Sequence, residues 1–368
     1  MHEEQTATAV EELLTRGIAD GAYPGAQFYA SVNGEVVADI AIGEARLGTP
    51  MTTETLVPWQ CNTKPVTATA VCQLWERGLV DVDAPVTAYV PEFGARGKHD
   101  VTVRHLLSHT AGFSFDPPGA TMRPVAWDEV ERLVCDAALM DDWTPGRAFR
   151  YSAWLGYAAL GMVVSRVDGR PFNQYVREEV FEPLEMTDCW LGVAPPGIDD
   201  VASRMAALHD MSGSEPLVLV GGGMYQSRHL AACYPATGGV GPVRQLARLW
   251  ESLRQAVAGG NELAVQPRTA QVMIRQDVGH YGLGVMVAPG YFGDWCPMAF
   301  GHDGMQSTQA FVDPDNDVVI VAAVNGMARG RMPREWMRNA GRLVYDTAVG
   351  SGDQPKAVKS WIRRRKAL

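Results

Sequence analysis

Apolar positions near the start of the chain recur at helical spacing and then change to alternation. Between residues 5 and 20 the apolar side chains share one side of a helix, namely Ala9, Val10, Leu13, Leu14 and Ile18. Residues 26–43 alternate between apolar and polar side chains, with Asn33-Gly34 in the middle of the run. Asn-Gly between two alternating runs is the strongest short-range signal of a β-hairpin. The sequence therefore predicts a helix followed by a hairpin.

The middle of the chain has the pattern of helices, and strands return only near its end. Helical spacing of apolar residues recurs in residues 61–80, 101–113, 154–169, 171–184 and 242–260. Runs typical of strands follow at 281–289 and 309–326, and the pattern of residues 333–350 predicts a last helix.

This order of elements predicts an α/β (α+β) fold with two lobes. The strands at the two chain ends pair into one antiparallel sheet, which the terminal helices flank. We expect residues 1–60 and 245–350 to form this sheet lobe and residues 61–244 to form a mostly helical lobe. An active site is expected in the cleft between the lobes.

Charge and hydropathy exclude several classes of function. The chain has 368 residues and a formal net charge of -10, so it would repel the phosphates of a nucleic acid. No run of 18 apolar residues occurs, and the N-terminus lacks the basic start and apolar run of a secretory signal. We therefore expect a cytoplasmic protein. Residues 351–368 form a basic tail, which indicates either a solvated terminus or a docking patch for an acidic partner.

The segment PWQCNTKPV, residues 58–66, contains the first candidate chemistry. Cys61 stands three residues before Lys64, and residues three apart on a helix share a face. If Cys61 begins the predicted helix, the free N–H groups there and a charged Lys64 favour its thiolate. A neutral Lys64 would act as the base instead. From this segment alone, Cys61 is a reacting thiol, a small buried residue or the replacement of a serine.

The other five cysteines indicate neither disulfides nor a metal site. They are widely spaced and form no C-x-x-C motif, at positions 72, 135, 189, 233 and 296. His105 and His109 have the i, i+4 spacing of zinc ligands, but no Glu follows the first His as in H-E-x-x-H. Three glycines at 221–223 lack the Lys-Ser or Lys-Thr of a phosphate loop. The sequence predicts no metal and no cofactor.

Further motifs follow Cys61 in a fixed order. They are VTVRHLLSHTAGF at 101–113, PGRAFRYSAWLGYAALG at 145–161, ATGGVGPVRQLARLW at 236–250 and GHDGMQS at 301–307. Together with CNTK, this order resembles the serine β-lactamase and penicillin-binding-protein superfamily over residues 8–346. The nearest branch is the class C-like group that includes family VIII esterases and related transacylases. The resemblance implies acyl transfer through a covalent intermediate.

The resemblance implies a nucleophile and a proton path. Cys61 and Lys64 match the first motif, Ser-x-x-Lys, with Cys in place of the nucleophilic Ser. Tyr151 matches the first residue of the second motif, Tyr-x-Asn, and Ala153 stands where the Asn is expected. Cys61 would attack an acyl carbonyl, while Lys64 and Tyr151 would move the proton. A tyrosine hydroxyl is a poor base at pH 7 unless a nearby cation lowers its pKa, and Lys64 is the candidate cation.

The third motif of the family takes its His-x-Gly form here, as His302-Asp303-Gly304. His302 is expected either to take part in catalysis or only to position its strand. The oxyanion hole is implied to be the backbone N–H groups of Cys61 and Met305. Six residues are candidates for substrate binding, namely Asp303, Gly304, Ala153, Trp154, Tyr225 and Trp295.

Three functions remain open at this point. The first is an acyltransferase that passes the acyl group from Cys61 to an amine or alcohol. The second is an esterase or amidase with the same residues, in which Cys61 can also be an introduced replacement of Ser. The third is a non-catalytic binding relative, which the survival of Lys64, Tyr151 and His302 opposes. In the first two cases the partners are a small-molecule acyl donor and acceptor, and the sequence does not indicate an oligomeric state.

Overall fold

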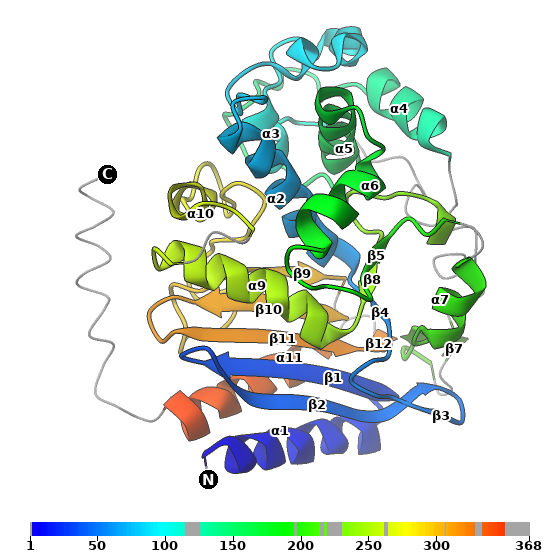
Figure 1. Ribbon diagram of the computed structural model, residues 1–368, viewed down its shortest axis with the longest axis vertical. Helices are drawn as coiled ribbons and strands as arrows, with labels where there is room; N and C mark the ends of the chain where they lie inside the picture. Colours follow the sequence, from blue (N-terminus) through cyan, green and yellow to red (C-terminus); the bar gives the residue numbers. More distant parts are fainter. Residues whose placement is uncertain are drawn as a thin grey trace.

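The computed structural model describes residues 2–114, 126–194, 197–213, 217–218, 230–260, 264–305, 307–327 and 333–349. Its main sheet combines strands from both ends of the chain in the order β3-β2-β1-β11-β10-β9, and every neighbouring pair is antiparallel. Figure 1 shows the blue N-terminal and orange C-terminal strands side by side. The predicted fold class is thereby confirmed. The strands are β1 (Gly25–Val32), β2 (Glu35–Arg46), β3 (Thr49–Pro50), β9 (Phe300–Gly304), β10 (Thr308–Asp313) and β11 (Val318–Val324).

The predicted hairpin joins β1 and β2. Both turn residues have left-handed backbones, with φ of 54° at Asn33 and 82° at Gly34. This conformation suits a two-residue hairpin turn, and Asn and Gly are the residues that adopt it at least cost.

Alternation along β11 gives each face of the sheet its own core. Val318, Ile320, Ala322 and Val324 belong to a cluster that also contains residues of α1 (His2–Ala19) and α11 (Pro333–Val344). Val319, Val321 and Ala323 belong to the cluster of the other face, which α9 (Val243–Val257) covers. In Figure 1, α9 accordingly lies in front of the strands and α11 behind them.

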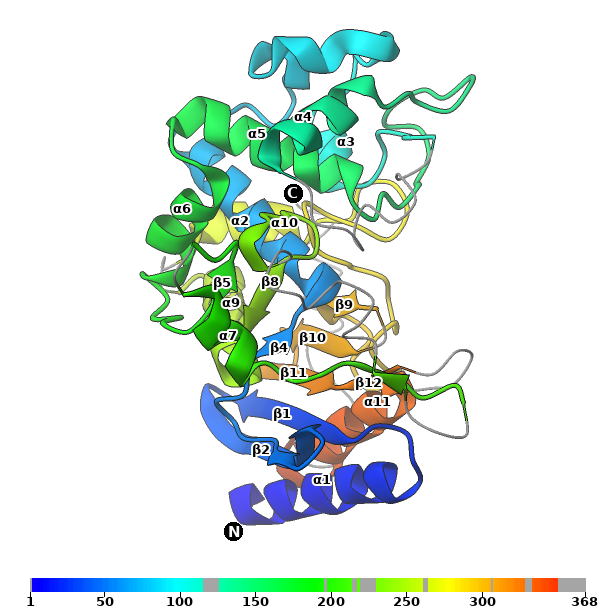
Figure 2. The same cartoon turned by 90° about the vertical axis from the view of Figure 1, so that its right-hand side faces the viewer.

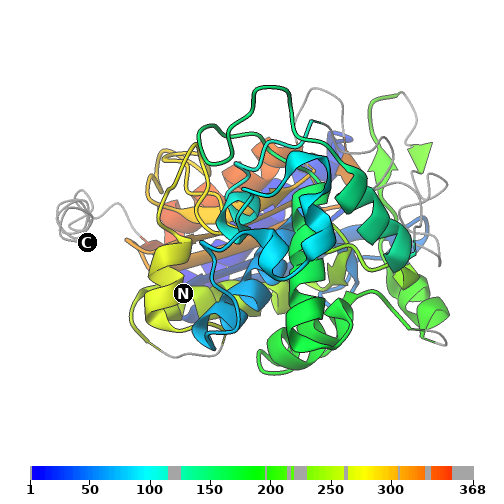
Figure 3. The ribbon, with the colours of Figure 1, turned by 90° about the horizontal axis from the view of Figure 1, so that it is seen from above.

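The middle of the chain is mostly helical and lies beyond β9, an edge strand of the main sheet (Figures 2 and 3). Its helices and the neighbouring helix α10 are α2 (Thr63–Glu76), α3 (Val103–Leu107), α4 (Trp127–Asp136), α5 (Leu155–Asp168), α6 (Phe172–Val176), α7 (Ile198–Arg204) and α10 (Pro267–Met273). A π-helical turn, Arg177–Phe181, continues α6, and another, Tyr345–Val349, continues α11. Among the described helices, none combines the length and the apolar character needed to cross a membrane.

Short elements connect the helices with the sheet. Among the described residues, 3₁₀ turns occur at Gln60–Asn62 (η1), Val86–Ala88 (η2) and Pro91–Gly97 (η3). Two small sheets have the orders β4-β8-β5 and β12-β6-β7. Their strands are β4 (Val57–Pro58), β5 (Trp190–Leu191), β6 (His209–Asp210), β7 (Leu217–Val218), β8 (Gly239–Gly241) and β12 (Gly326–Met327).

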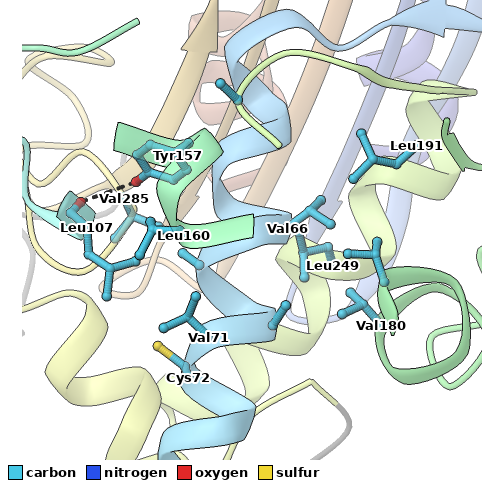
Figure 4. Packing of buried hydrophobic residues seen from close by; sticks show 14 of the residues in the cluster. Val66, Val71, Cys72, Leu107, Tyr157, Leu160, Val180, Leu191, Leu249 and Val285 are labelled. Atoms are coloured by element: carbon cyan, nitrogen blue, oxygen red, sulfur yellow. Dashed lines mark hydrogen bonds between the residues drawn. The ribbon is translucent and has the colours of Figure 1, made fainter. Parts of the chain in front are cut away.

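Helix α2 is the central helix of the molecule. Its side chains Val66, Val71 and Cys72 pack among residues of neighbouring elements, including Leu160 of α5 and Leu249 of α9 (Figure 4). The same hydrophobic cluster continues to β10 and β11. The helical region and the sheet thus share one core, and the division into lobes at residues 60 and 245 stays a proposal.

The strand predicted at 281–289 is wrong. This segment forms only isolated bridges, between Tyr281 and Met286 and between Met286 and Gly301. Gly284 has φ of 85°, and a Cβ there would lie 2.1 Å from Cβ of Ala68 in α2. The chain bends at this glycine to pass α2, which an extended strand would not allow.

Candidate active site

Cys61 lies in the 3₁₀ turn η1, which leads directly into α2, so it stands at the start of the helix as predicted. The turn is fixed by the side chain of Thr63, which donates to the carbonyl of Gln60 at 2.7 Å and accepts from the N–H of Gly239 at 2.9 Å. Gln60 has a left-handed backbone with φ of 53°. Such a conformation is uncommon for a non-glycine residue and is found preferentially at functional sites.

Strand β9 ends against this turn. A Cβ on Gly304 would lie 2.4 Å from the carbonyl oxygen of Trp59 and 2.1 Å from Oγ1 of Thr308. Only glycine therefore permits this approach. Met305 follows with φ of 41°, and a tight turn closes where the N–H of Ser307 donates to the carbonyl of Gly304 at 2.9 Å. The backbone of Met305 is thus next to the turn that holds Cys61.

Lys64 is fully buried in the first turn of α2. Its Nζ donates to the carbonyl oxygens of Ala153 at 2.9 Å and Ala236 at 3.2 Å. The same atom lies 5.1 Å from the ring centroid of Tyr151 and 5.3 Å from that of Tyr157. The amine is therefore held in one place by two carbonyls and two aromatic faces.

Tyr151 connects Lys64 with Cys61. The residue as a whole is 37% exposed, but its hydroxyl lies close enough to Cys61 for that side chain to raise its pKa. Burial of the hydroxyl raises the pKa of Tyr151 well above 10, and the neighbouring Cys61 and Tyr281 raise it further. The net shift of the Tyr151 pKa is thus opposite to the lowering for which Lys64 was the candidate. Desolvation of the phenolate outweighs the neighbouring cation, so Tyr151 is a neutral phenol at pH 7.

His302 is buried in β9 and is a neutral imidazole. Its Nδ1 lies 2.8 Å from the carbonyl oxygen of Asp303, which can only accept, so Nδ1 carries the proton. The hydroxyl of Tyr281 then donates to Nε2 at 3.3 Å. Burial and the charge of Lys64 lower the pKa of His302 to about 3. His302 therefore has no positive charge to offer at neutral pH.

The sequence prediction did not identify His109 as part of this site. Its ring lies 4.3 Å from the ring of Tyr151 and 4.7 Å from that of Tyr281. Burial, then Lys64 and then His302 lower the pKa of His109 well below 6.5. The one signal in the sequence was its i, i+4 spacing from His105, which is that of zinc ligands but lacks the Glu of H-E-x-x-H.

No metal site is formed by these two histidines. His105 caps α3, since its Nδ1 accepts from the N–H of Thr102 at 3.2 Å and its own N–H donates to Oγ1 of Thr102. Within the described parts of the chain, no group of three or more His, Cys, Asp or Glu side chains is placed to hold a metal ion.

The residues predicted to bind substrate have different surroundings. Ala153 contributes the carbonyl that holds Lys64, whereas Trp154 is fully buried in the main core. Trp295 packs against Tyr345, at 6.5 Å between ring centroids, and under the guanidinium of Arg342. Arg342 lies in α11 and Tyr345 in its π-helical extension. In the structure, Trp295 therefore packs against the C-terminal helix, and Trp154 packs in the main core.

Asp303 and Tyr225 complete this set. The carboxylate of Asp303 accepts from the hydroxyl of Tyr291 at 2.7 Å and from Nε2 of Gln309 at 3.1 Å, which fixes it within the sheet region. Tyr225 and the glycines at 221–223 lie outside the described residues, as does the basic tail 351–368.

Comparisons with known proteins identify the family of this chain. The family model described as Beta-lactamase matches residues 10–343. The esterase/beta-lactamase LipL of Mycobacterium tuberculosis is 28% identical over 319 residues, which are 73% of this chain and 71% of LipL. Esterase EstB of Burkholderia gladioli is 32% identical over 210 residues, and this match spans 52% of the chain and about half of EstB, 53%.

A solved structure is similar to this chain over nearly the whole fold. The crystal structure of a family VIII carboxylesterase is 26% identical and superposes with a TM-score of 0.74, covering 92% of this chain and 97% of that one. Since the family model covers most of the chain, the chain belongs to the beta-lactamase family.

Proposed function

We propose that this protein is an acyl-transfer enzyme in which Cys61 carries the acyl group as a thioester. The observation that carries the proposal is the position of Tyr151 between Lys64, whose buried Nζ lies 5.1 Å from its ring centroid, and Cys61, whose side chain adds to burial in raising the pKa of its hydroxyl. A nucleophile, a proton carrier and a fixed amine thus meet at the start of one helix. The family supports acyl chemistry, since LipL and EstB are both named esterases.

In the first half-reaction, Sγ of Cys61 attacks the carbonyl carbon of the acyl donor. A C–S bond forms, and the bond from this carbon to the leaving oxygen breaks. The neutral phenol of Tyr151 gives its proton to the leaving oxygen and receives the thiol proton in return. The raised pKa of Tyr151 suits this exchange, because the phenol is protonated before and after it. Lys64 holds the ring of Tyr151 and stabilises negative charge that develops on the relay.

The oxyanion of the tetrahedral intermediate needs fixed N–H donors. We assign this role to the backbone N–H groups of Cys61 and Met305. Cys61 lies in the first turn, where N–H groups have no acceptor within the helix. The close approach of Gly304 to Trp59 brings Met305 to the same place.

In the second half-reaction, an acceptor attacks the thioester carbonyl. The new C–N or C–O bond forms, the C–S bond breaks, and the acceptor's proton returns to sulfur through Tyr151. Amines attack thioesters well relative to water, which favours transfer. The names of LipL and EstB favour the alternative, an esterase that uses water as the acceptor. The residues of the first half-reaction are the same in both cases.

The cysteines bear on the compartment. All six are unpaired in the structure, and a thiol nucleophile is preserved best in a reducing environment. This observation supports the cytoplasm as the proposed location.

Intact-mass measurement after incubation with p-nitrophenyl butyrate tests the thioester. We expect an increase of one butyryl group, which hydroxylamine removes and which peptide mapping locates on Cys61. Cys61→Ala should abolish the adduct, while Cys135→Ala is the matched control, because Cys135 is more accessible than the buried Cys61 but lies in α4. Turnover of the ester without any adduct on Cys61, or an unchanged rate in Cys61→Ala, contradicts the proposal.

Transfer and hydrolysis are separated by Cys61→Ser. An oxygen ester is attacked less readily by amines than a thioester, so the ratio of transfer product to free acid should fall in the Ser variant. The ratio is measured for both proteins with one acyl donor and a panel of amines and alcohols. Exclusive hydrolysis by the Cys protein, together with faster hydrolysis by the Ser variant, would favour the esterase and a replaced nucleophile.

A further inference from the structure

His109 has a backbone and a position that the proposed chemistry does not yet explain. It adopts φ of 57° and is 2% exposed. Two backbone hydrogen bonds connect His109 and its neighbour with the segment that carries Tyr151. The N–H of Arg150 donates to the carbonyl of His109 at 2.8 Å, and the N–H of Gly146 donates to the carbonyl of Thr110 at 3.0 Å. A left-handed backbone at a non-glycine residue costs about 1–3 kcal/mol and persists where the surroundings fix it.

The hydrogen bonds of His109 determine its tautomer. The backbone N–H of Ser152 donates to Nδ1 at 3.2 Å, so Nδ1 is the unprotonated nitrogen and Nε2 carries the hydrogen. Nε2 is buried and has no hydrogen-bond partner among the described residues. An unpaired buried donor is unfavourable for stability. Stability alone therefore does not account for a histidine at this position.

The ring of His109 is the common contact of three tyrosines. Its centroid lies 4.3 Å from that of Tyr151, with 36° between the planes, 5.3 Å from that of Tyr157 and 4.7 Å from that of Tyr281. Lys64 bounds the Tyr151 ring as well, with Nζ 5.1 Å from its centroid. The imidazole and the amine thus restrict where the phenol hydroxyl points.

We propose that His109 is a positioning residue, whose buried ring and bond to the N–H of Ser152 align the Tyr151 hydroxyl with the Cys61 thiol. The inference rests on the proposed role of Tyr151 as proton carrier. Because the imidazole packs against the ring of Tyr151 and its Nδ1 accepts from the N–H of the next residue, Ser152, it restrains both the ring of Tyr151 and the backbone that carries it. A misplacement of about 1 Å in a reacting group can lower a rate on the order of 10²-fold.

A double-mutant cycle tests this inference with p-nitrophenyl butyrate as the acyl donor. His109→Asn tolerates the left-handed backbone and can still accept from Ser152, but it removes the ring. We expect kcat to fall by about 10–10²-fold with little change in KM. In the Tyr151→Phe background the same substitution should cause almost no further loss, because the hydroxyl that it aligns is already absent. A residue that only stabilises the fold would give additive losses.

A second variant separates the ring from the hydrogen bond. His109→Phe keeps an aromatic ring against Tyr151 but removes the acceptor for Ser152, and we expect it to recover part of the rate lost in His109→Asn. His280→Gln is the matched control, because His280 is an exposed histidine whose ring contacts Phe149 at 6.2 Å. Melting temperatures of all variants report folding, and the alkylation rate of Cys61 is measured in any variant too unstable for turnover assays.

The outcomes distinguish the inference from the proposed function. An unchanged kcat in Tyr151→Phe overturns both. A large loss in Tyr151→Phe with an unchanged kcat in His109→Asn overturns only the role of His109, as do equal losses from His109→Asn in the two backgrounds. Unaltered alkylation of Cys61 in a poorly folded His109→Asn protein also counts against the role of His109.

Discussion

Lys64 and Lys98 are both fully buried, and each donates to backbone carbonyls. Lys98 saturates its ammonium with three of them, since Nζ lies 2.7 Å from the oxygen of Ala95, 2.7 Å from that of Cys135 and 2.5 Å from that of Ala137. These carbonyls belong to η3 and to the end of α4. Lys98 therefore ties two surface elements together by satisfying carbonyls that have no partner in their helices.

Lys64 has a different set of neighbours. It contacts two carbonyls from distant parts of the chain and the faces of Tyr151 and Tyr157, and Tyr151 in turn contacts the thiol of Cys61. Burial and carbonyl contacts are common to both lysines and so do not indicate catalysis. The difference is a chain of groups that can exchange protons, which leads from Lys64 through Tyr151 to the proposed nucleophile, Cys61.

The largest expected effect comes from removing each amine in turn. Lys64→Met keeps most of the buried volume but removes the group beside Tyr151, so the rate of acyl-enzyme formation should fall by about 10²–10⁴-fold. Lys98→Met should leave that rate unchanged, because no group near Cys61 contacts it. Rapid-mixing assays with p-nitrophenyl butyrate give both rates. Similar rates for the two variants would remove the functional distinction between the lysines.

The next largest expected effect compares Tyr151 and Tyr157, whose rings both lie next to the amine of Lys64. Tyr151→Phe should lower the rate by on the order of 10²-fold, since its hydroxyl is the proposed proton carrier. Tyr157 is at nearly the same distance from Nζ, but its hydroxyl donates to the carbonyl of Leu107 at 3.2 Å, as Figure 4 shows. Tyr157→Phe should therefore reduce stability by about 1 kcal/mol and leave the rate intact. The proton path is misassigned if Tyr157→Phe is the more damaging substitution in steady-state assays.

The sheet could be predicted from the sequence because its signals are local. Alternation and Asn33-Gly34 specify β1 and β2, and the apolar run 318–324 specifies β11. The strand predicted at 281–289 failed for a reason that is not local. Gly284 bends there because Ala68 of α2 occupies the space beside it, and a contact between residues so far apart in sequence leaves no periodic pattern.

Motif order predicted that Cys61, Lys64 and Tyr151 share one site. It did not predict how deeply these side chains are buried or which other residues contact them. The direction of the Tyr151 pKa shift depends on how deeply the hydroxyl is buried, which no motif encodes. His109 was missed because its partners, Tyr151 and Tyr281, come from two other segments of the chain. Trp154 and Trp295 were expected near substrate, whereas Trp154 packs against Tyr234 and Trp295 against Tyr345.

The smaller effects concern Lys98. Lys98→Met leaves the carbonyls of Ala95, Cys135 and Ala137 without their donor, so the free energy of unfolding should decrease by on the order of 1–3 kcal/mol. Urea denaturation measures this loss. Lys64→Met serves as the comparison. We expect its main effect on the rate of acyl-enzyme formation, whereas the main effect of Lys98→Met is on the free energy of unfolding. Should Lys98→Met instead match the wild-type midpoint, the three hydrogen bonds contribute nothing net to the fold.

The smallest effect is the pH dependence of the Lys98 contribution. Burial lowers the pKa of Lys98 to about 8, whereas the nearby Cys135 and Asp136 act in the opposite direction and Arg96 in the same one. Below this pKa both the folded and the unfolded chain hold the proton, and the buried charge destabilises the fold. Between this pKa and the ordinary lysine pKa of 10.5, the folded chain loses the proton while the unfolded chain keeps it. The free energy of unfolding therefore rises with pH in this window, by about 1 kcal/mol per pH unit.

Lys98→Met isolates that contribution, because every other titrating group is common to both proteins. The stability advantage of the wild type over Lys98→Met should grow as pH rises from about 8 to about 10, and should stay constant between about pH 6 and 7. Urea denaturation of both proteins across this range gives the difference directly. A constant difference up to about pH 10 would mean that Lys98 keeps its charge throughout. The three carbonyls would then stabilise the ammonium of Lys98 more than burial destabilises it. Lys98 would be a buried cation, as we propose for Lys64, and not a buried neutral amine.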